Sequence, residues 1–169
     1  NGLAYLAGAL GEKGKHKIRI FDLNVIDWPE DKVVEAVAEE RPDLVGFSIK
    51  SFSVNNALAL ASKIKKSVSA KLIAGGPHIT LCALDFFTKD NNGVFDFGFQ
   101  GEGDRSFPVF CDEFENKDKY KEIIGLVYKN NEGKWQFNKG EFVDNLDDIT
   151  RPDFRYFVGE IDFEKQEGY

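Results

Sequence analysis

Residues 72–80 read LIAGGPHIT, an apolar run that stops at two glycines. The run predicts a buried parallel strand, and Thr80 predicts the start of the next helix. In open α/β sheets, ligands bind at the carboxyl ends of such strands. Gly75 and Gly76 allow positive φ and let another molecule approach the backbone closely. The alternative is a tight strand-to-helix turn without a ligand, and the rest of the chain must decide between the two.

Helices and strands alternate through the first 120 residues. Helical segments carry apolar residues at i, i+3, i+4 and i+7, whereas the strands are short apolar runs. The predicted strands cover residues 16–23, 43–49, 70–74 and 93–99, and helices precede and follow each of them. This alternation predicts an α/β fold of the Rossmann-like (flavodoxin-like) kind, a parallel sheet with flanking helices and right-handed crossovers.

The alternation begins on a helix, so we expect the first strand of the fold to be missing from this chain. In the flavodoxin-like strand order 2-1-3-4-5, that strand is central. Its loss would leave a slot about 9–10 Å wide between residues 18–23 and 44–49, which ladder hydrogen bonds cannot bridge. The sequence contains no methionine, so we interpret the chain as a processed or excised piece.

The chain changes character after residue 120. Residues 123–128 and 134–137 flank the turn sequence NNEG, which predicts a β-hairpin. From residue 140 onward the sequence is acidic and irregular, which is typical of a linker. We therefore predict an α/β domain over residues 1–120, a hairpin appendage over 121–139 and a linker over 140–169.

Composition limits the function classes. The 169 residues have a formal net charge of −7 and a sequence pI of about 4.9, which argues against nucleic-acid and anionic-membrane partners. No run of about 18 apolar residues predicts a membrane span. Cys82 and Cys111 lie in predicted helices without CxxC spacing, so we expect buried free thiols, no metal site and a cytoplasmic protein.

Three loops should meet at the carboxyl edge of the sheet, namely residues 48–53, 75–80 and 100–104. They are rich in glycine and hydroxyl groups, and the helix N-termini behind them favour anions and acceptors. The serines could equally be helix caps, and Glu102 and Asp104 could simply stabilise a helix dipole. His78 is the one histidine in these loops, but a lone histidine after Gly-Gly-Pro is more often structural. No catalytic motif is present, so no catalytic residue is expected.

Five short motifs occur in a familiar order: GLAYLA at residues 2–7, PDLVGFS at 42–48, GGPH at 75–78, GEGD at 101–104 and IGLVY at 124–128. Together they resemble the N-terminal cobalamin (B12)-binding domain of B12-dependent radical S-adenosylmethionine (SAM) proteins. That group includes anaerobic magnesium-protoporphyrin monomethyl ester cyclases and methyltransferases. The resemblance covers roughly residues 2–150.

The resemblance implies a Rossmann-like domain that holds the corrin at the carboxyl edge of its sheet, with His78 at the rim and not on the cobalt. The expected partners are cobalamin and a C-terminal radical SAM domain, and that domain would carry a 4Fe-4S cluster and S-adenosylmethionine. The fragment itself would be non-catalytic, and the parent would be a radical SAM methyltransferase or cyclase. The implied cofactor-binding residues are Gly2, Ser48, Ser51, Ser53, Gly75, Gly76, Pro77, His78, Gly101, Glu102 and Gly103.

The chain departs from the family pattern in three respects. The Asp-x-His-x-x-Gly motif of methionine synthase-type domains would precede the first helix, so only Gly2 could match it. Lys50 stands where those domains prefer an apolar residue, and Cys-x3-Cys-x2-Cys is absent. One alternative is a degenerate Rossmann-like interaction domain that binds no cofactor and positions a catalytic partner domain. A weaker alternative is a flavodoxin-like FMN-binding or receiver domain.

Overall fold

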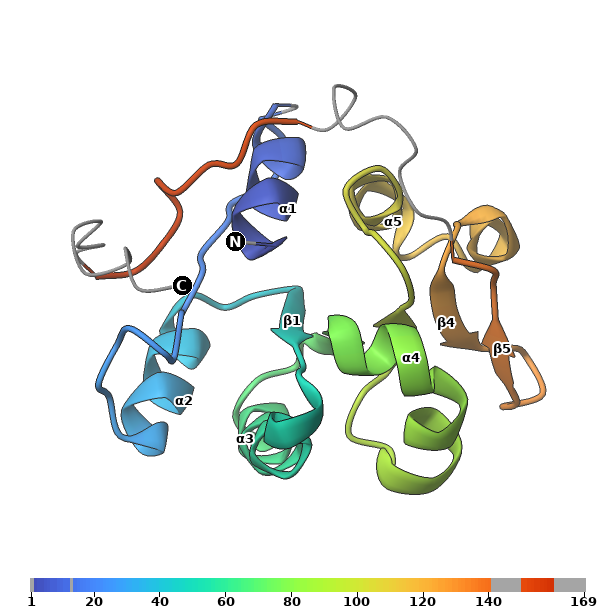
Figure 1. Cartoon of the computed structure of the whole chain (residues 1–169), viewed down its shortest axis with the longest axis horizontal. Coiled ribbons are helices and arrows are strands. Elements are labelled where there is room, and N and C mark those ends of the chain that lie inside the picture. The colour runs from blue at the N-terminus through green and yellow to red at the C-terminus, as the bar shows by residue number, and fades with distance from the viewer. Residues whose placement is uncertain (1, 13, 141–149, 160–169) are drawn as a thin grey trace.

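The computed structural model describes residues 2–12, 14–140 and 150–159. Its centre is a five-stranded sheet with the order β1-β2-β3-β4-β5 (Figure 1). The strands β1 (Leu44–Ser48), β2 (Lys71–Gly75) and β3 (Phe97–Phe99) are parallel. The strands β4 (Leu126–Lys129) and β5 (Trp135–Phe137) continue the sheet in antiparallel pairing. The predicted α/β fold is confirmed, with the parallel part limited to three strands.

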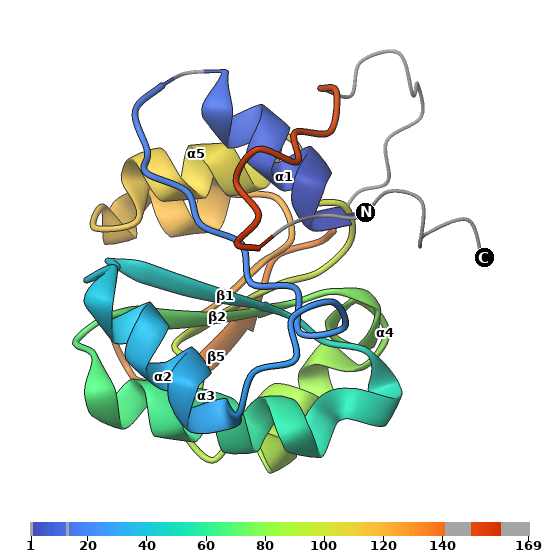
Figure 2. The ribbon, with the colours of Figure 1, turned by 90° about the vertical axis from the view of Figure 1, so that its left-hand side faces the viewer.

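Helices cover both faces of the sheet (Figure 2). One face carries α2 (Glu30–Glu39), α3 (Val54–Ser67) and α4 (Pro77–Asp85), and α4 continues into the π-helical turn η2 (Phe86–Asp90). The other face carries α1 (Gly2–Gly11), α5 (Ser106–Glu113) and the 3₁₀-helix η3 (Lys117–Glu122). A short 3₁₀ turn, η1 (Ser51–Ser53), leads from β1 into α3. No helix in the described residues is long and apolar enough to cross a membrane.

Each face of the sheet has its own aromatic core. On the α3–α4 face the fully buried side chains include Phe86 and Phe95, whose rings lie 5.8 Å apart. On the α5 face Phe110 is fully buried against the rings of Phe97 and Tyr120. Burying a phenylalanine stabilises a fold by about 1.5–3 kcal/mol relative to leaving it exposed. These two cores fix the sheet between its helices and so fix the positions of the loops at its edge.

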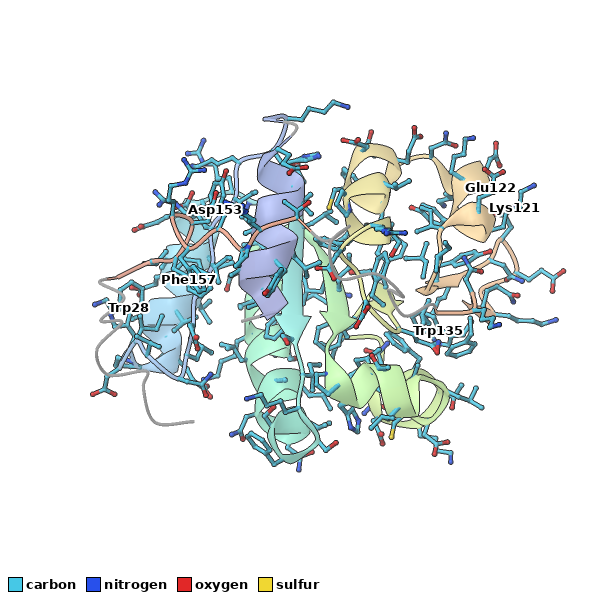
Figure 3. The ribbon with its side chains drawn as sticks, turned by 45° about the horizontal axis from the view of Figure 1, so that its top comes forward. Trp28, Lys121, Glu122, Trp135, Asp153 and Phe157 are labelled. Atoms are coloured by element: carbon cyan, nitrogen blue, oxygen red, sulfur yellow. The ribbon has the colours of Figure 1, made fainter. Side chains whose placement is uncertain are left out.

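The hairpin predicted as an appendage is part of the main sheet. β4 pairs with β3, and its residues Leu126 and Val127 are both fully buried, one in each of the two cores. On β5, the Trp135 ring lies 4.6 Å from the ring of Phe87 (Figure 3). The hairpin therefore supplies one side of both cores. The domain boundaries at residues 120 and 139 stay a prediction.

β3 is shorter than the predicted strand over residues 93–99. The buried side chain of Asn91 accepts a hydrogen bond from the Phe95 N–H at 2.6 Å and donates to its carbonyl at 3.0 Å. The Asp96 carboxylate accepts from the Leu72 N–H at 3.0 Å. Side chains thus satisfy backbone groups that a longer ladder would have used.

The strand predicted over residues 16–23 is not formed. Only Ile20 makes a β-bridge, and its partner is Phe157 and not a residue of β1. The Ile20 N–H donates to the Tyr156 carbonyl at 2.9 Å, and the Ile20 carbonyl accepts from the Val158 N–H at 2.8 Å. Among the described residues, no ladder joins this segment to β1.

Part of the predicted linker packs against the domain. Residues 150–159 cross α1, where the Asp153 N–H donates to the Ala4 carbonyl at 2.8 Å (Figure 3). A Cβ at Gly8 would collide with the Arg151 carbonyl, so the helix needs glycine there. The described part of the linker therefore covers α1. The remainder, residues 141–149 and 160–169, lies outside the described residues.

The two cysteines differ in exposure, which corrects the expectation that both are buried. Cys82 is exposed on α4, whereas Cys111 is partly buried on α5. Burial raises the pKa of the Cys111 thiol to about 12, and the neighbouring Asp112 carboxylate adds to the shift. Because the thiolate is the reactive form, Cys111 should be nearly inert near pH 8.

We therefore expect Cys82 to react quickly with iodoacetamide at pH 8 in the folded chain, and both cysteines to react after unfolding in urea. Peptide mass spectrometry identifies the modified residue. Modification of Cys111 at a comparable rate in the folded chain would contradict the burial described above.

Candidate functional site

The carboxyl ends of β1, β2 and β3 lie side by side. Ser48 at the end of β1 is in register with Gly75 at the end of β2, and Ala74 is in register with Gly98 of β3. The three loops that follow these strands therefore start at one edge of the sheet, as predicted. Figure 2 shows the first turn of α1 on the same side of the molecule as this edge.

Gly76 makes the turn between β2 and α4, with φ 92° and ψ −177°, a conformation that is essentially restricted to glycine. A Cβ at this position would lie 2.7 Å from the Ile49 nitrogen and 3.0 Å from the Ser48 hydroxyl oxygen. The β1 loop therefore passes directly over the glycine. At Gly75 a Cβ would lie 3.9 Å from the Phe47 carbonyl oxygen and 4.0 Å from the Phe99 Cβ, which is ordinary van der Waals contact.

His78 connects the first and second loops. Its backbone N–H donates to the Ile49 carbonyl at 3.0 Å, and its Nδ1 lies 3.2 Å from the Ser51 hydroxyl. The ring packs edge-on against Phe86, with the centroids 5.8 Å apart. These contacts show that His78 helps to hold the start of α4 against the loop that follows β1.

Thr80 connects the second and third loops, and sequence reasoning did not select it. Its hydroxyl oxygen accepts a hydrogen bond from the Gly101 N–H at 3.1 Å. The same hydroxyl donates to the Gly76 carbonyl at 3.2 Å. One side chain thus satisfies backbone groups from both glycine loops. The link could not be found from sequence, because it spans two segments about twenty residues apart.

The other predicted residues are less closely grouped. The Ser53 hydroxyl bonds only within its own turn, accepting from the Lys50 N–H and donating to the Lys50 carbonyl, which matches the capping alternative. Gly103 lies beside Leu6 of α1, because a Cβ added to this glycine would be 3.3 Å from the leucine side chain. Gly2, at the start of α1, would have nothing within 4 Å of an added Cβ. Pro77 is exposed at the first position of α4.

Acidic and apolar side chains border the edge. Burial raises the pKa of the Asp104 carboxyl, and the neighbouring Glu102 raises it further. Phe52 of η1 is 85% exposed, with the Lys50 ammonium 5.7 Å from its ring centre. An exposed phenylalanine beside serine hydroxyl groups is an apolar surface that a ligand could cover. Sequence reasoning did not select Phe52, because sequence alone does not show whether a side chain is exposed.

Residues 2–12, 14–140 and 150–159 contain no group of three or more histidine, cysteine, aspartate or glutamate side chains that could hold a metal ion. The edge therefore offers glycine backbone, serine and threonine hydroxyls, one histidine and one exposed aromatic ring.

Comparison with known proteins identifies the family. The sequence model of the B12 binding domain matches residues 1–110, about two thirds of the chain. The chain belongs to the B12-binding domain family. The matched residues of this B12-binding domain include β1, β2, β3 and all three loops at their carboxyl ends.

Relatives of this B12-binding domain are larger proteins. An uncharacterized methyltransferase from Pyrococcus horikoshii, PH0819, is 28% identical over 155 residues, which is 90% of this chain and 33% of that protein. The radical enzyme OxsB with aqua-cobalamin and S-adenosylmethionine bound is 17% identical, with a TM-score of 0.74 over 89% of this chain and 21% of OxsB. The methyltransferase TsrM from Kitasatospora setae with cobalamin and a [4Fe-4S] cluster bound is 20% identical, with a TM-score of 0.63 over 89% and 28%. The chain thus spans about a third or less of each.

Proposed function

We propose that this chain binds cobalamin at the carboxyl edge formed by β1, β2 and β3. The observation that carries the proposal is the Gly75–Gly76 turn. Gly76 holds a glycine-only conformation beneath the β1 loop, and Gly75 is in register with Ser48 at the carboxyl ends of β2 and β1. Membership of the B12-binding family supports the same assignment.

The residues at this edge fit such a cofactor. Gly75 places a residue without a side chain at the end of β2, Ser48 and Ser51 are exposed, and Phe52 offers an apolar ring. We assign Gly101, Glu102 and Gly103 to the third side of the site, with Pro77 and His78 at the rim and Gly2 facing it from α1. Ser53 is the weakest member of the predicted set, because its hydroxyl bonds within its own turn.

Cobalamin would supply methyl-carrier or radical chemistry, and the protein would supply binding and orientation. The degenerate interaction domain without a cofactor is less favoured. Support for the cofactor-binding function comes from the B12-binding family model, which matches residues 1–110.

A second proposal concerns a longer protein of which this chain would be one domain. We infer a parent chain with a C-terminal radical SAM domain, which would hold the 4Fe-4S cluster and S-adenosylmethionine. Support comes from the relatives, of which this chain spans 21–33%. Methyl transfer is the favoured reaction type because of the methyltransferase relatives, and oxidative cyclisation of a porphyrin ester is the second. A cytoplasmic location stays part of the proposal.

The binding proposal is tested by reconstitution. The chain is incubated with hydroxocobalamin and passed over a gel-filtration column, and absorbance is recorded at a corrin wavelength and at 280 nm. Corrin absorbance should co-elute with the folded protein. Elution of all corrin in the small-molecule volume, from protein whose circular dichroism shows it to be folded, would overturn the proposal.

A further inference from the structure

Thr80 has a contact pattern unlike that of an ordinary helix threonine. In helices, a threonine hydroxyl commonly donates to the carbonyl four residues earlier. Thr80 does this with Gly76, and Thr88 does the same with Leu84 at 2.6 Å. Thr80 differs because its oxygen also accepts the Gly101 N–H, from the loop after β3. It is therefore part of a bridge between two loops, whereas Thr88 bonds only within its own helix.

Both ends of this bridge are backbone groups of site glycines. The Gly76 carbonyl accepts from the Thr80 N–H at 3.0 Å and from the Thr80 hydroxyl at 3.2 Å. Gly101 has a positive φ of 76°, a backbone conformation that glycine adopts more readily than other residues. Glycine has no side chain that could anchor this part of the loop. The partly buried hydrogen bond from Thr80 therefore helps to orient the first residues of the third loop.

We propose that Thr80 is a positioning residue for the cofactor site and that it acts by holding the Gly101 loop against the Gly76 turn. This inference rests on the proposed function, because the ligand for which it orders the loops is the cobalamin proposed above. Loss of the hydroxyl would leave the Gly101 N–H without this acceptor and allow the loop to move. The ligand would then have to order that loop on binding, which lowers affinity.

The test compares variants that keep or remove the hydroxyl. Thr80→Val replaces the hydroxyl by a methyl group of similar size, and Thr80→Ala removes it without adding bulk. Thr80→Ser keeps it. Thr88→Val is the matched control, because it removes a similar helix bond that reaches no second loop. The readouts are the dissociation constant for hydroxocobalamin from an absorbance titration, and hydrogen exchange at the Gly101 amide without ligand.

We expect Thr80→Val and Thr80→Ala to weaken hydroxocobalamin binding about tenfold, in keeping with the loss of one partly buried hydrogen bond. Thr80→Ser and Thr88→Val should bind within about twofold of the unmodified chain, a difference well below 1.4 kcal/mol. Exchange at Gly101 should be faster only in Thr80→Val and Thr80→Ala. Equal affinity and equal exchange in all four variants would overturn the inference.

The two proposals can fail separately. If the unmodified chain binds no hydroxocobalamin, the proposed function fails. Exchange at Gly101 then still decides the inference about loop positioning. If the unmodified chain binds and folded Thr80→Val and Thr80→Ala bind equally well, only the role of Thr80 is wrong. Thr80→Ala serves as the test of hydroxyl loss if Thr80→Val does not fold.

Discussion

Gly76→Ala should reduce hydroxocobalamin binding by at least about tenfold and lower the free energy of unfolding by about 1–3 kcal/mol. The new methyl group would lie 2.7 Å from the Ile49 nitrogen and 3.0 Å from the Ser48 hydroxyl oxygen, so the β1 loop must move. The glycine-only φ and ψ add backbone strain. The measurements are an absorbance titration with hydroxocobalamin and urea unfolding.

Gly93→Ala is the matched control for this variant. Gly93 also has a positive φ, 77°, but nothing lies within 4 Å of a Cβ there. The substitution should cost about 1–2 kcal/mol of stability through backbone strain alone and leave affinity within about twofold. If Gly76→Ala binds hydroxocobalamin as tightly as Gly93→Ala, the Gly76 turn is not part of the cofactor site.

Phe110→Ala should produce a large loss of stability, about 3–5 kcal/mol. Its side chain is fully buried, and its ring lies within 6.4 Å of the rings of Phe97, Phe99, Phe107 and Tyr120. Truncation leaves a cavity that rigid aromatic neighbours cannot close. Urea unfolding monitored by circular dichroism gives the difference in free energy.

Val109→Ala, one residue earlier on α5, is the control for Phe110→Ala. Val109 is 46% exposed, so its truncation removes little buried surface and should change stability by no more than about 0.5 kcal/mol. Similar losses for the two variants would mean that α5 does not bury Phe110 against the sheet as described.

The parallel part of the fold could be predicted from sequence because the strand signals are local. The apolar runs before Ser48 and Gly75 are followed by turn residues and amphipathic helices, and both became strands with nearly the predicted bounds. Residues 16–23 show the limit of this reasoning. Their alternation resembles a strand, but a strand needs a neighbour within hydrogen-bonding distance, and only Ile20 has one.

The β-hairpin could be predicted from sequence, but its position beside β3 in the sheet could not. Turn chemistry at residues 130–133 predicts two antiparallel strands, yet it does not say which strand they join. Their attachment to β3 depends on Leu126 and Val127 filling the two cores. Such long-range packing has no local sequence signal.

The candidate site was partly predictable for the same reason. Consecutive glycines indicate a backbone conformation that other residues rarely adopt, so Gly75 and Gly76 could be selected from sequence. The loop-to-loop bond of Thr80 and the exposure of Phe52 depend on tertiary structure and could not. The close association of Ser51 with His78 was also invisible until the loops were placed.

The central claim is that the carboxyl edge of β1, β2 and β3 binds cobalamin. Hydrogen exchange of the chain with and without hydroxocobalamin tests both the binding and its location. We predict slower exchange in residues 48–53, 75–80 and 100–104, and no change in residues 129–135 at the distant hairpin turn. Unchanged exchange in all three loops at saturating hydroxocobalamin, or slower exchange confined to other segments, would contradict the claim.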